Sequence, residues 1–323
     1  MIDRNPYISI VSPVYQAEGI VDELVKRITE DASKITQDFE IILVEDGSPD
    51  QSWEEIVRNC ETDKRVKGIK LSRNFGQHYA ISAGLKESKG DYVVVMDCDL
   101  QDNPKYIYDL LNKSKEGFDI IYTIHKDRKH GKFKTFFASL FHHIHNRLVG
   151  NIILHSSGKI GAYSLLTRKV VDAFSIINDH HRHYLMILRW LGFSKTHITI
   201  DHEKRFKGKT SYTYLKLLKL AIDGIVSNSE KLLRLSIYIG FLFSLAGFIW
   251  IIYIVIMYFI SGFQSGWASI IVLILFSTGL ILISLGIVGI YIGKIFEQTK
   301  GRPLYLIDKK INFNTVINNS NLT

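Results

Sequence analysis

Two carboxylates one residue apart, in the segment Asp97-Cys98-Asp99, are the residues of this 323-residue chain best suited to chemistry. They follow the apolar run at residues 93–96, which has the pattern of a buried strand. Acidic groups placed close together repel one another unless a cation lies between them, and Mg²⁺ is commonly bound through carboxylates and substrate phosphates. The segment therefore predicts a Mg²⁺ or Mn²⁺ site, against the alternative of a loop or helix cap with solvated Asp side chains.

Short apolar runs that end in turns predict the elements that would position these carboxylates. The predicted strands are residues 8–12, 40–44, 66–71, 91–96 and 119–122, with helices at 19–35 and 76–87. Strands that alternate with helices are typical of an α/β fold with a mostly parallel sheet, in which ligands bind beyond the carboxyl ends of the strands. The polar residues that follow the first four strands, Asp46 among them, are therefore expected to converge on one site.

The composition divides the chain into two parts. Net charge is +8, with 22% charged residues, yet residues 235–293 contain no Asp, Glu, Lys or Arg. That run fits two membrane spans, at about 236–260 and 267–293, and excludes a purely soluble or a disordered protein. Basic residues flank it at Lys231, Arg234 and Lys294, so the positive-inside rule places the N-terminal domain and the C-terminal tail in the cytoplasm.

The expected organisation is a catalytic domain over 1–212, an amphipathic interfacial region over 213–234, the two spans within 235–293, and a cytoplasmic tail over 294–323. Residues 126–147 interleave basic and Phe side chains, which fits either a solvated amphipathic helix or an anion-binding or membrane-surface segment. We expect no signal peptide at the N-terminus and no disulfide between Cys60 and Cys98. Signatures of nucleic-acid binding are lacking in the sequence.

Four motifs occur in order along the chain: Ser12-Pro13-Val14-Tyr15, Val44-Glu45-Asp46-Gly47-Ser48, the segment 71–76 and the segment 96–102. In this combination and spacing the sequence resembles family 2 glycosyltransferases. It is most similar to the branch that contains dolichyl-phosphate mannose synthases and bacterial polyisoprenyl-phosphate glycosyltransferases. The likeness extends through residues 205–212, both spans and residues 301–305, which is nearly the whole chain.

The resemblance implies a GT-A fold and inverting, metal-dependent transfer of a sugar from a nucleotide-sugar donor to polyprenyl phosphate at the cytoplasmic membrane face. A UDP-hexose is the favoured donor and undecaprenyl phosphate the favoured acceptor. The product would be a lipid-linked monosaccharide for cell-envelope glycan modification, made by a multi-pass protein of the inner (cytoplasmic) membrane. A homo-oligomer is consistent with the resemblance.

The resemblance also assigns roles to residues. Asp97, Asp99 and Gln101 would hold the Mg²⁺ or Mn²⁺ ion and the diphosphate, and Arg128 and Arg205 would face phosphates. Asp97, Asp99, Arg128 and Arg205 are thus the expected catalytic residues. The residues expected to bind the donor are Pro13, Tyr15, Glu18, Asp46, Ser72, Asp97, Gln101 and Lys209.

The sequence departs from the family pattern at Ala162 and Ser164, where many relatives carry Asp and Arg. A phosphate acceptor is already an anion near neutral pH and needs no general base, so this departure is expected to alter positioning more than reaction class. One alternative is transfer to a sugar hydroxyl of a growing glycan, for which Asp102 is the candidate base. Another is a catalytically silent membrane protein that binds a nucleotide sugar.

Overall fold

The computed structural model describes residues 7–125, 159–180, 182–201, 231–261 and 266–313. The chain forms two compact units. The first combines Met1–Lys129, Ile153–Thr210 and Arg302–Thr323, and the second combines His130–Ile152 and Ser211–Gly301. The predicted basic segment at 126–147, and residues 213–230 of the predicted interfacial region, lie outside the described residues.

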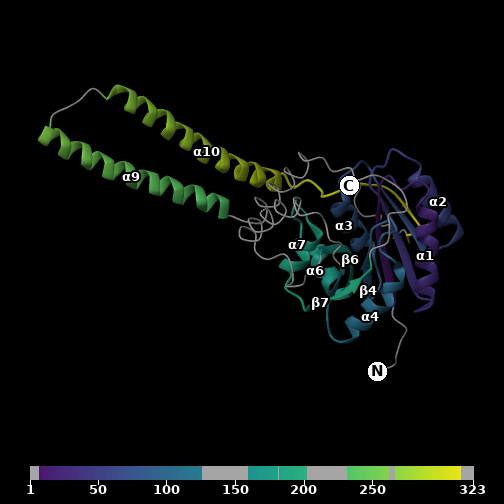
Figure 1. Cartoon of the computed structure of the whole chain (residues 1–323). Coiled ribbons are helices and arrows are strands. Elements are labelled where there is room, and N and C mark those ends of the chain that lie inside the picture. Colours follow the sequence, from purple (N-terminus) through teal and green to yellow (C-terminus); the bar gives the residue numbers. More distant parts are fainter. Residues whose placement is uncertain (1–6, 126–158, 181, 202–230, 262–265, 314–323) are drawn as a thin grey trace, which may run out of the picture. The chain divides into compact units, whose positions relative to one another are not determined.

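An eight-stranded mixed sheet forms the centre of the first unit, with strand order β7-β5-β6-β4-β1-β2-β3-β8 (Figure 1). The strands are β1 (Ile8–Val14), β2 (Phe39–Glu45), β3 (Val66–Leu71), β4 (Tyr92–Val95), β5 (Ile120–His125), β6 (Lys159–Thr167), β7 (Lys195–Ile200) and β8 (Ile307–Ile311). Strands β1 to β4 pair in parallel, as do β5 and β7. Antiparallel pairing occurs where β6 meets β4 and β5, and where β8 meets β3. The predicted α/β class with a mostly parallel sheet is confirmed, and the five predicted strands are present.

Helices cover both faces of this sheet because each presents an apolar stripe to it. In α1, for example, Val21, Leu24 and Ile28 are fully buried at helical spacing. One core lies under α1 (Val21–Ser33), α2 (Ser52–Thr62) and α4 (Ile107–Lys115), which follows the short helix η1 (Pro104–Tyr106). The other lies under α3 (Gln77–Glu87), α6 (Arg168–Ile176) and α7 (Tyr184–Trp190). Both cysteines are free, as expected.

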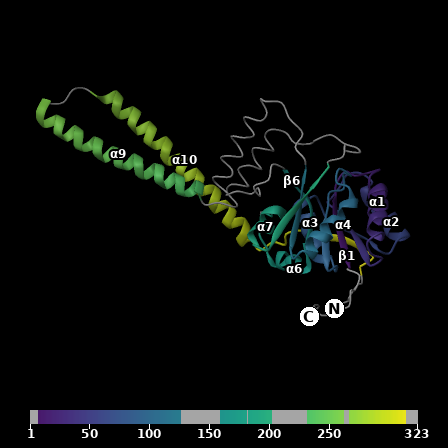
Figure 2. The ribbon, with the colours of Figure 1, turned by 60° about the horizontal axis from the view of Figure 1, so that its bottom comes forward.

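The described part of the second unit consists of two long helices, α9 (Lys231–Ser261) and α10 (Trp267–Thr299), which lie side by side (Figure 2). Each contains a segment long and apolar enough to cross a membrane, at Leu233–Ile254 and Phe276–Thr299. These two helices correspond to the two predicted spans.

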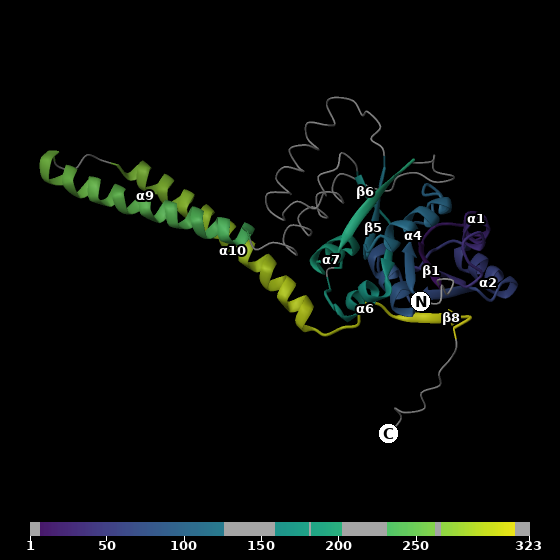
Figure 3. The ribbon, with the colours of Figure 1, turned by 90° about the horizontal axis from the view of Figure 1, so that it is seen from below.

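After α10 the chain returns to the first unit, where β8 pairs with the outer edge of β3 (Figure 3). Residues 294–323 were expected to form a tail, so this strand was not predicted. The reason is visible in the sequence: only Ile307 and Ile311 of β8 are apolar, and the three residues between them are charged and exposed.

Candidate functional site

The polar segments that follow the parallel strands meet at the carboxyl edge of the sheet, as expected from the sequence. Val14, the last residue of β1, is in register with Glu45, and Val11 is in register with Val95. The backbone N–H of Asp46 donates to the carbonyl oxygen of Val14 at 3.0 Å. The segments that begin at Tyr15, Asp46 and Met96 therefore leave neighbouring strands on the same side.

Asp46 joins two of these segments. Its carboxylate is buried and accepts hydrogen bonds from the backbone N–H groups of Phe75 (2.7 Å) and Gly76 (2.8 Å). Burial raises the pKa of Asp46, although the two N–H donors and Arg73 act to lower it. The loop at residues 72–76, which we call the 72–76 loop, is thus held by the carboxylate at the end of β2.

The segment after β1 is held by an unusual run of hydrogen bonds. Four consecutive backbone N–H groups, at residues 16–19, donate to side chains of the turn after β2 and of α2. The acceptors are Ser48, Ser52, Asp50 and Glu55. Tyr15, immediately before this run, keeps 45% of its surface exposed. Tyr15 and Glu18, which are predicted to bind the nucleotide-sugar donor, therefore lie on a backbone that is fixed against the Asp46 turn.

Asp97, Asp99 and Gln101 directly follow β4, and hydrogen bonds fix two of them. The side-chain amide of Gln77 donates to Oδ1 of Asp97 at 2.6 Å, and the backbone N–H of Gln101 donates to Oδ1 of Asp99 at 3.1 Å. Gln77 was not among the residues predicted from the sequence. Its signal was positional, since it is the first residue of α3 and follows the 71–76 motif.

Asp102 completes a cluster of carboxylates at this edge. It is buried, and burial together with the charges of Asp97 and Asp99 raises its pKa to about 7. Carboxylates that repel one another in this way suit a hard divalent cation such as Mg²⁺ or Mn²⁺. Within the described residues, no group of three or more His, Cys, Asp or Glu side chains is arranged to hold a metal ion by itself. Phosphate oxygens of a donor are the natural remaining ligands.

The remaining predicted phosphate ligands, Arg128, Arg205 and Lys209, lie outside the described residues. Pro13 lies in β1 and Ser72 opens the 72–76 loop, so both belong to the same edge as Asp46. The assigned roles of all these residues stay predictions.

Ala162 and Ser164, the two departures from the family pattern, lie on β6 next to β4. Ser164 is fully buried and is in register with Val95. Its hydroxyl donates to the carbonyl oxygen of Ala162 at 2.8 Å and lies 2.7 Å from the hydroxyl of Tyr184. The Ser164 side chain therefore takes part in an interior contact with α7.

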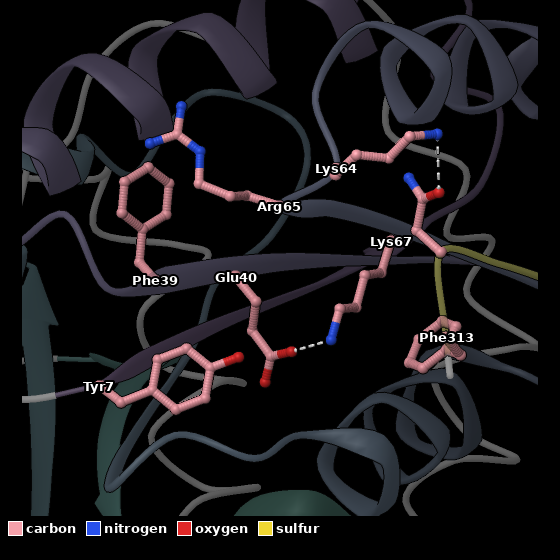
Figure 4. Close-up of a pocket in the computed structure, with 8 residues that line it drawn as sticks. Tyr7, Phe39, Glu40, Lys64, Arg65, Lys67 and Phe313 are labelled. Carbon is pink, nitrogen blue, oxygen red and sulfur yellow. Dashed lines mark hydrogen bonds and ion pairs between the residues drawn. The ribbon is translucent and has the colours of Figure 1, made fainter. Parts of the chain in front are cut away.

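A separate pocket of about 420 Å³ lies at the opposite edge of the sheet, near the starts of β1, β2 and β3 (Figure 4). On its wall the ammonium of Lys67 lies 2.5 Å from the carboxylate of Glu40. The Ser9 hydroxyl and the backbone N–H of Lys89 also donate to Glu40. Burial opposes ionisation, but these partners hold the pKa of Glu40 below its usual value. This network contains no residue of the carboxyl edge.

Comparison with known proteins agrees with this arrangement. Residues 9–174 match the model of the family described as glycosyl transferase family 2. The "uncharacterized glycosyltransferase YkcC" of Bacillus subtilis (strain 168) is 36% identical over 310 residues, which cover 95% of each chain. The undecaprenyl-phosphate 4-deoxy-4-formamido-L-arabinose transferase of Yersinia pestis (strain Pestoides F) is 30% identical over 326 residues, covering 98% of this chain and 97% of the relative.

Among solved structures, glucosyl-3-phosphoglycerate synthase from Mycobacterium tuberculosis, in complex with Mn²⁺ and UDP-glucose, aligns with a TM-score of 0.49 and 15% identity. The alignment covers 69% of this chain and 77% of that one. The family match spans the sheet edge that carries Asp46, Asp97 and Asp99, and the two relatives match almost end to end, so the chain belongs to the family 2 glycosyltransferases.

Proposed function

We propose that this protein transfers a sugar from a nucleotide-sugar donor to a polyprenyl phosphate at the cytoplasmic face of the inner membrane, with inversion at the anomeric carbon. A UDP-hexose is the favoured donor and undecaprenyl phosphate the favoured acceptor. The observation that carries the proposal is the meeting of the Asp46 turn with Asp97 and Asp99 at one sheet edge. The undecaprenyl-phosphate acceptor in the name of the Yersinia relative and the two apolar helices support the choice of acceptor.

The reaction needs little from the protein beyond positioning and charge. An oxygen of the acceptor phosphate forms a bond to the anomeric carbon while the bond from that carbon to the nucleoside diphosphate breaks, and the diphosphate leaves with the electron pair. The acceptor phosphate is ionised near neutral pH because its second pKa is about 6, so no side chain has to remove a proton. A bound divalent cation would supply positive charge opposite the leaving diphosphate.

The protein's own groups then have distinct tasks. Asp97 and Asp99, with Gln101, would hold the cation, and the amide of Gln77 fixes the orientation of Asp97. Asp46 holds the 72–76 loop through its carboxylate and the end of β1 through its backbone N–H. Tyr15, the next residue after β1, would border the nucleoside. Arg128, Arg205 and Lys209 would hold phosphates, because guanidinium and ammonium groups form charge-assisted hydrogen bonds with them.

A second candidate, transfer to a sugar hydroxyl, is favoured by one observation. A hydroxyl acceptor needs a general base, and a carboxyl with a pKa near 7 is well matched to that task. Asp102 has such a pKa, about 7, and lies within electrostatic reach of Asp97 and Asp99. The identity of the product distinguishes the two reactions.

The test uses the purified full chain in lipid nanodiscs with Mg²⁺ or Mn²⁺, a panel of nucleotide sugars, and either undecaprenyl phosphate or an oligosaccharide as acceptor. We expect a lipid-linked monosaccharide with undecaprenyl phosphate. Replacing Asp99→Ala should lower the rate at least about 100-fold, because the diphosphate loses its cation.

Asp172→Ala is the matched control, since Asp172 is an exposed carboxylate on α6, which follows the end of β6 that pairs with the start of β4. It should retain the parent rate. Product formed only on the oligosaccharide would favour the second candidate. Binding of a nucleotide sugar without transfer from any donor, by folded protein supplied with either metal, would contradict both reactions and leave a silent binding protein.

A further inference from the structure

Strand β8 belongs to the sheet of the first unit, although in the sequence it comes after both long helices, α9 and α10. It pairs antiparallel with β3, from Gly68 opposite Ile311 to Leu71 opposite Ile307, with an irregularity between Lys70 and Leu71. Without β8, β3 would be the edge of the sheet. Residues after the apolar helices therefore complete the sheet that carries the candidate site.

One end of this added segment reaches the candidate site. The backbone N–H of Ser72 donates to the carbonyl oxygen of Leu306 at 2.9 Å, one residue before β8 begins. Ser72 is the first residue of the 72–76 loop, and the last two residues of that loop donate to Asp46. The loop is thus anchored at its start to the C-terminal segment and at its end to the carboxylate that follows β2.

The other end of β8 is anchored near the starts of β2 and β3, at the end of the sheet opposite the candidate site. The side-chain amide of Asn312 donates to the carbonyl oxygens of Cys60 (2.6 Å) and Val66 (2.8 Å). Beside it, the ring of Phe313 lies 5.4 Å from the ammonium of Lys67, in the pocket of Figure 4. These contacts fix where β8 ends and therefore set its register on β3.

Two further contacts hold the middle and the start of the segment. The ammonium of Lys310 lies 2.8 Å from a carboxylate oxygen of Glu87, at the end of α3. Tyr305 packs against the core under α3, α6 and α7. The charged side chains at residues 308–310 are exposed, so β8 is held by its ends and its backbone more than by burial.

We propose that β8 is a positioning strand for nucleotide-sugar binding: by holding Ser72 and the register of β3, it sets the position of the 72–76 loop against Asp46. This rests on the proposed function, in which Ser72 of that loop is expected to bind the donor. The strand touches no reacting atom and acts through the loop. Its loss should therefore weaken donor binding more than it slows the chemical step.

The test compares Asn312→Gly, which removes both hydrogen bonds to backbone carbonyls and the exposed one accepted from Lys64, and tolerates the backbone φ of +63° at that position, with the exposed Lys309→Ala on the same strand. In the full chain, hydrogen exchange at residues 72–76 should become roughly tenfold faster in Asn312→Gly, since the hydrogen bonds that anchor the end of β8 are lost. The donor KM should rise severalfold with kcat nearly unchanged. Lys309→Ala should match the parent in both measurements.

Unchanged exchange at residues 72–76 in a folded Asn312→Gly chain, whose β8 amides exchange faster, would overturn the proposal. A fall in kcat with an unchanged donor KM would do the same. If Asn312→Gly does not fold, Lys310→Ala gives the same readouts with a smaller expected change, about twofold, because only a partly exposed ion pair and a cation–π contact with Phe313 are lost. Exchange needs no turnover, so an inactive parent with the expected exchange pattern would defeat the proposed function alone.

Discussion

Burial shifts three titratable side chains around the candidate site toward their neutral forms. It raises the pKa of Asp46, raises that of Asp102 to about 7, and lowers that of His78 to about 4, with His183 adding to the last shift. Charges interact more strongly where water is excluded. A donor diphosphate and its cation at this edge would therefore gain more from each fixed partner than they would on an open surface.

His78 gives a prediction about stability and pH. Its ring centroid lies 4.3 Å from that of His183, with the two rings tilted by 41°, and its Nδ1 accepts from the backbone N–H of Tyr184 at 3.5 Å. The unfolded chain binds a proton at this residue near pH 6.5, whereas the folded chain does so only near pH 4. Stability that is fully present above pH 6.5 should therefore fall, by up to about 3 kcal/mol, as the pH drops toward 4.

Urea unfolding between pH 7.5 and 4.5 checks this. His78→Gln should show a shallower loss of stability with falling pH than the parent, because it lacks the buried titrating ring. His197→Gln, a matched change on β7, should keep the parent's dependence. An identical pH dependence in His78→Gln and the parent would show that His78 does not titrate as described.

At the scale of elements, the connections after β2 and β3 are packed directly on one another. A Cβ atom at Gly47 would lie 2.3 Å from the backbone nitrogen of Asn74 and 2.4 Å from the carbonyl carbon of Arg73. Gly47 also has a φ of +63°, which side chains rarely adopt. The glycine lets the Asp46 carboxylate reach the N–H groups of the 72–76 loop.

Gly47→Ala should therefore cost about 3 kcal/mol of unfolding free energy, from backbone strain and overpacking together, and should weaken nucleotide binding. Gly117→Ala is the control, because its φ is +99° but nothing lies within 4 Å of the added Cβ. That variant should cost only about 1 kcal/mol, with binding unchanged. Chemical denaturation and titration with UDP measure both effects. Equal costs at the two sites would mean that the 72–76 loop moves aside freely.

At the scale of the whole molecule, the returning strand constrains membrane topology. The segments before α9 and after α10 fold into one sheet, so they must lie on the same side of any membrane that these helices cross. The number of crossings between them is therefore even. Two apolar helices satisfy this as a hairpin, and the basic residues that flank them agree with the cytoplasmic side proposed for the first unit.

This predicts opposite labelling of two introduced cysteines in intact cells. Gln264→Cys, in the connection between the helices, should react with a membrane-impermeant maleimide, and Asp308→Cys on β8 should react only after permeabilisation. The unsubstituted chain controls for Cys60 and Cys98. Equal labelling of both positions in intact cells would contradict the hairpin.

The sequence by itself determined those strands, helices and site residues that can be recognised from local patterns of residue type. The strand at Tyr92–Val95 is a continuous apolar run, and the two apolar helices are recognisable from the charge-free stretch before Lys294. The carboxyl-edge site followed from the same patterns, because parallel strands bring the residues after them together. Asp46 and Asp97 were therefore predictable from residue type and spacing.

Only the tertiary structure decided which distant segments complete that edge. It inserted β6 antiparallel between β4 and β5, brought Gln77 to Asp97, and added β8 beside β3. The charged residues of β8 have the pattern of a solvated tail, and Gln77 is marked in the sequence only by its position after the 71–76 motif, since its residue type is ordinary for an exposed helix start. Their stabilisation comes from backbone hydrogen bonds and contacts between residues far apart in the chain, which only the folded sheet brings within reach.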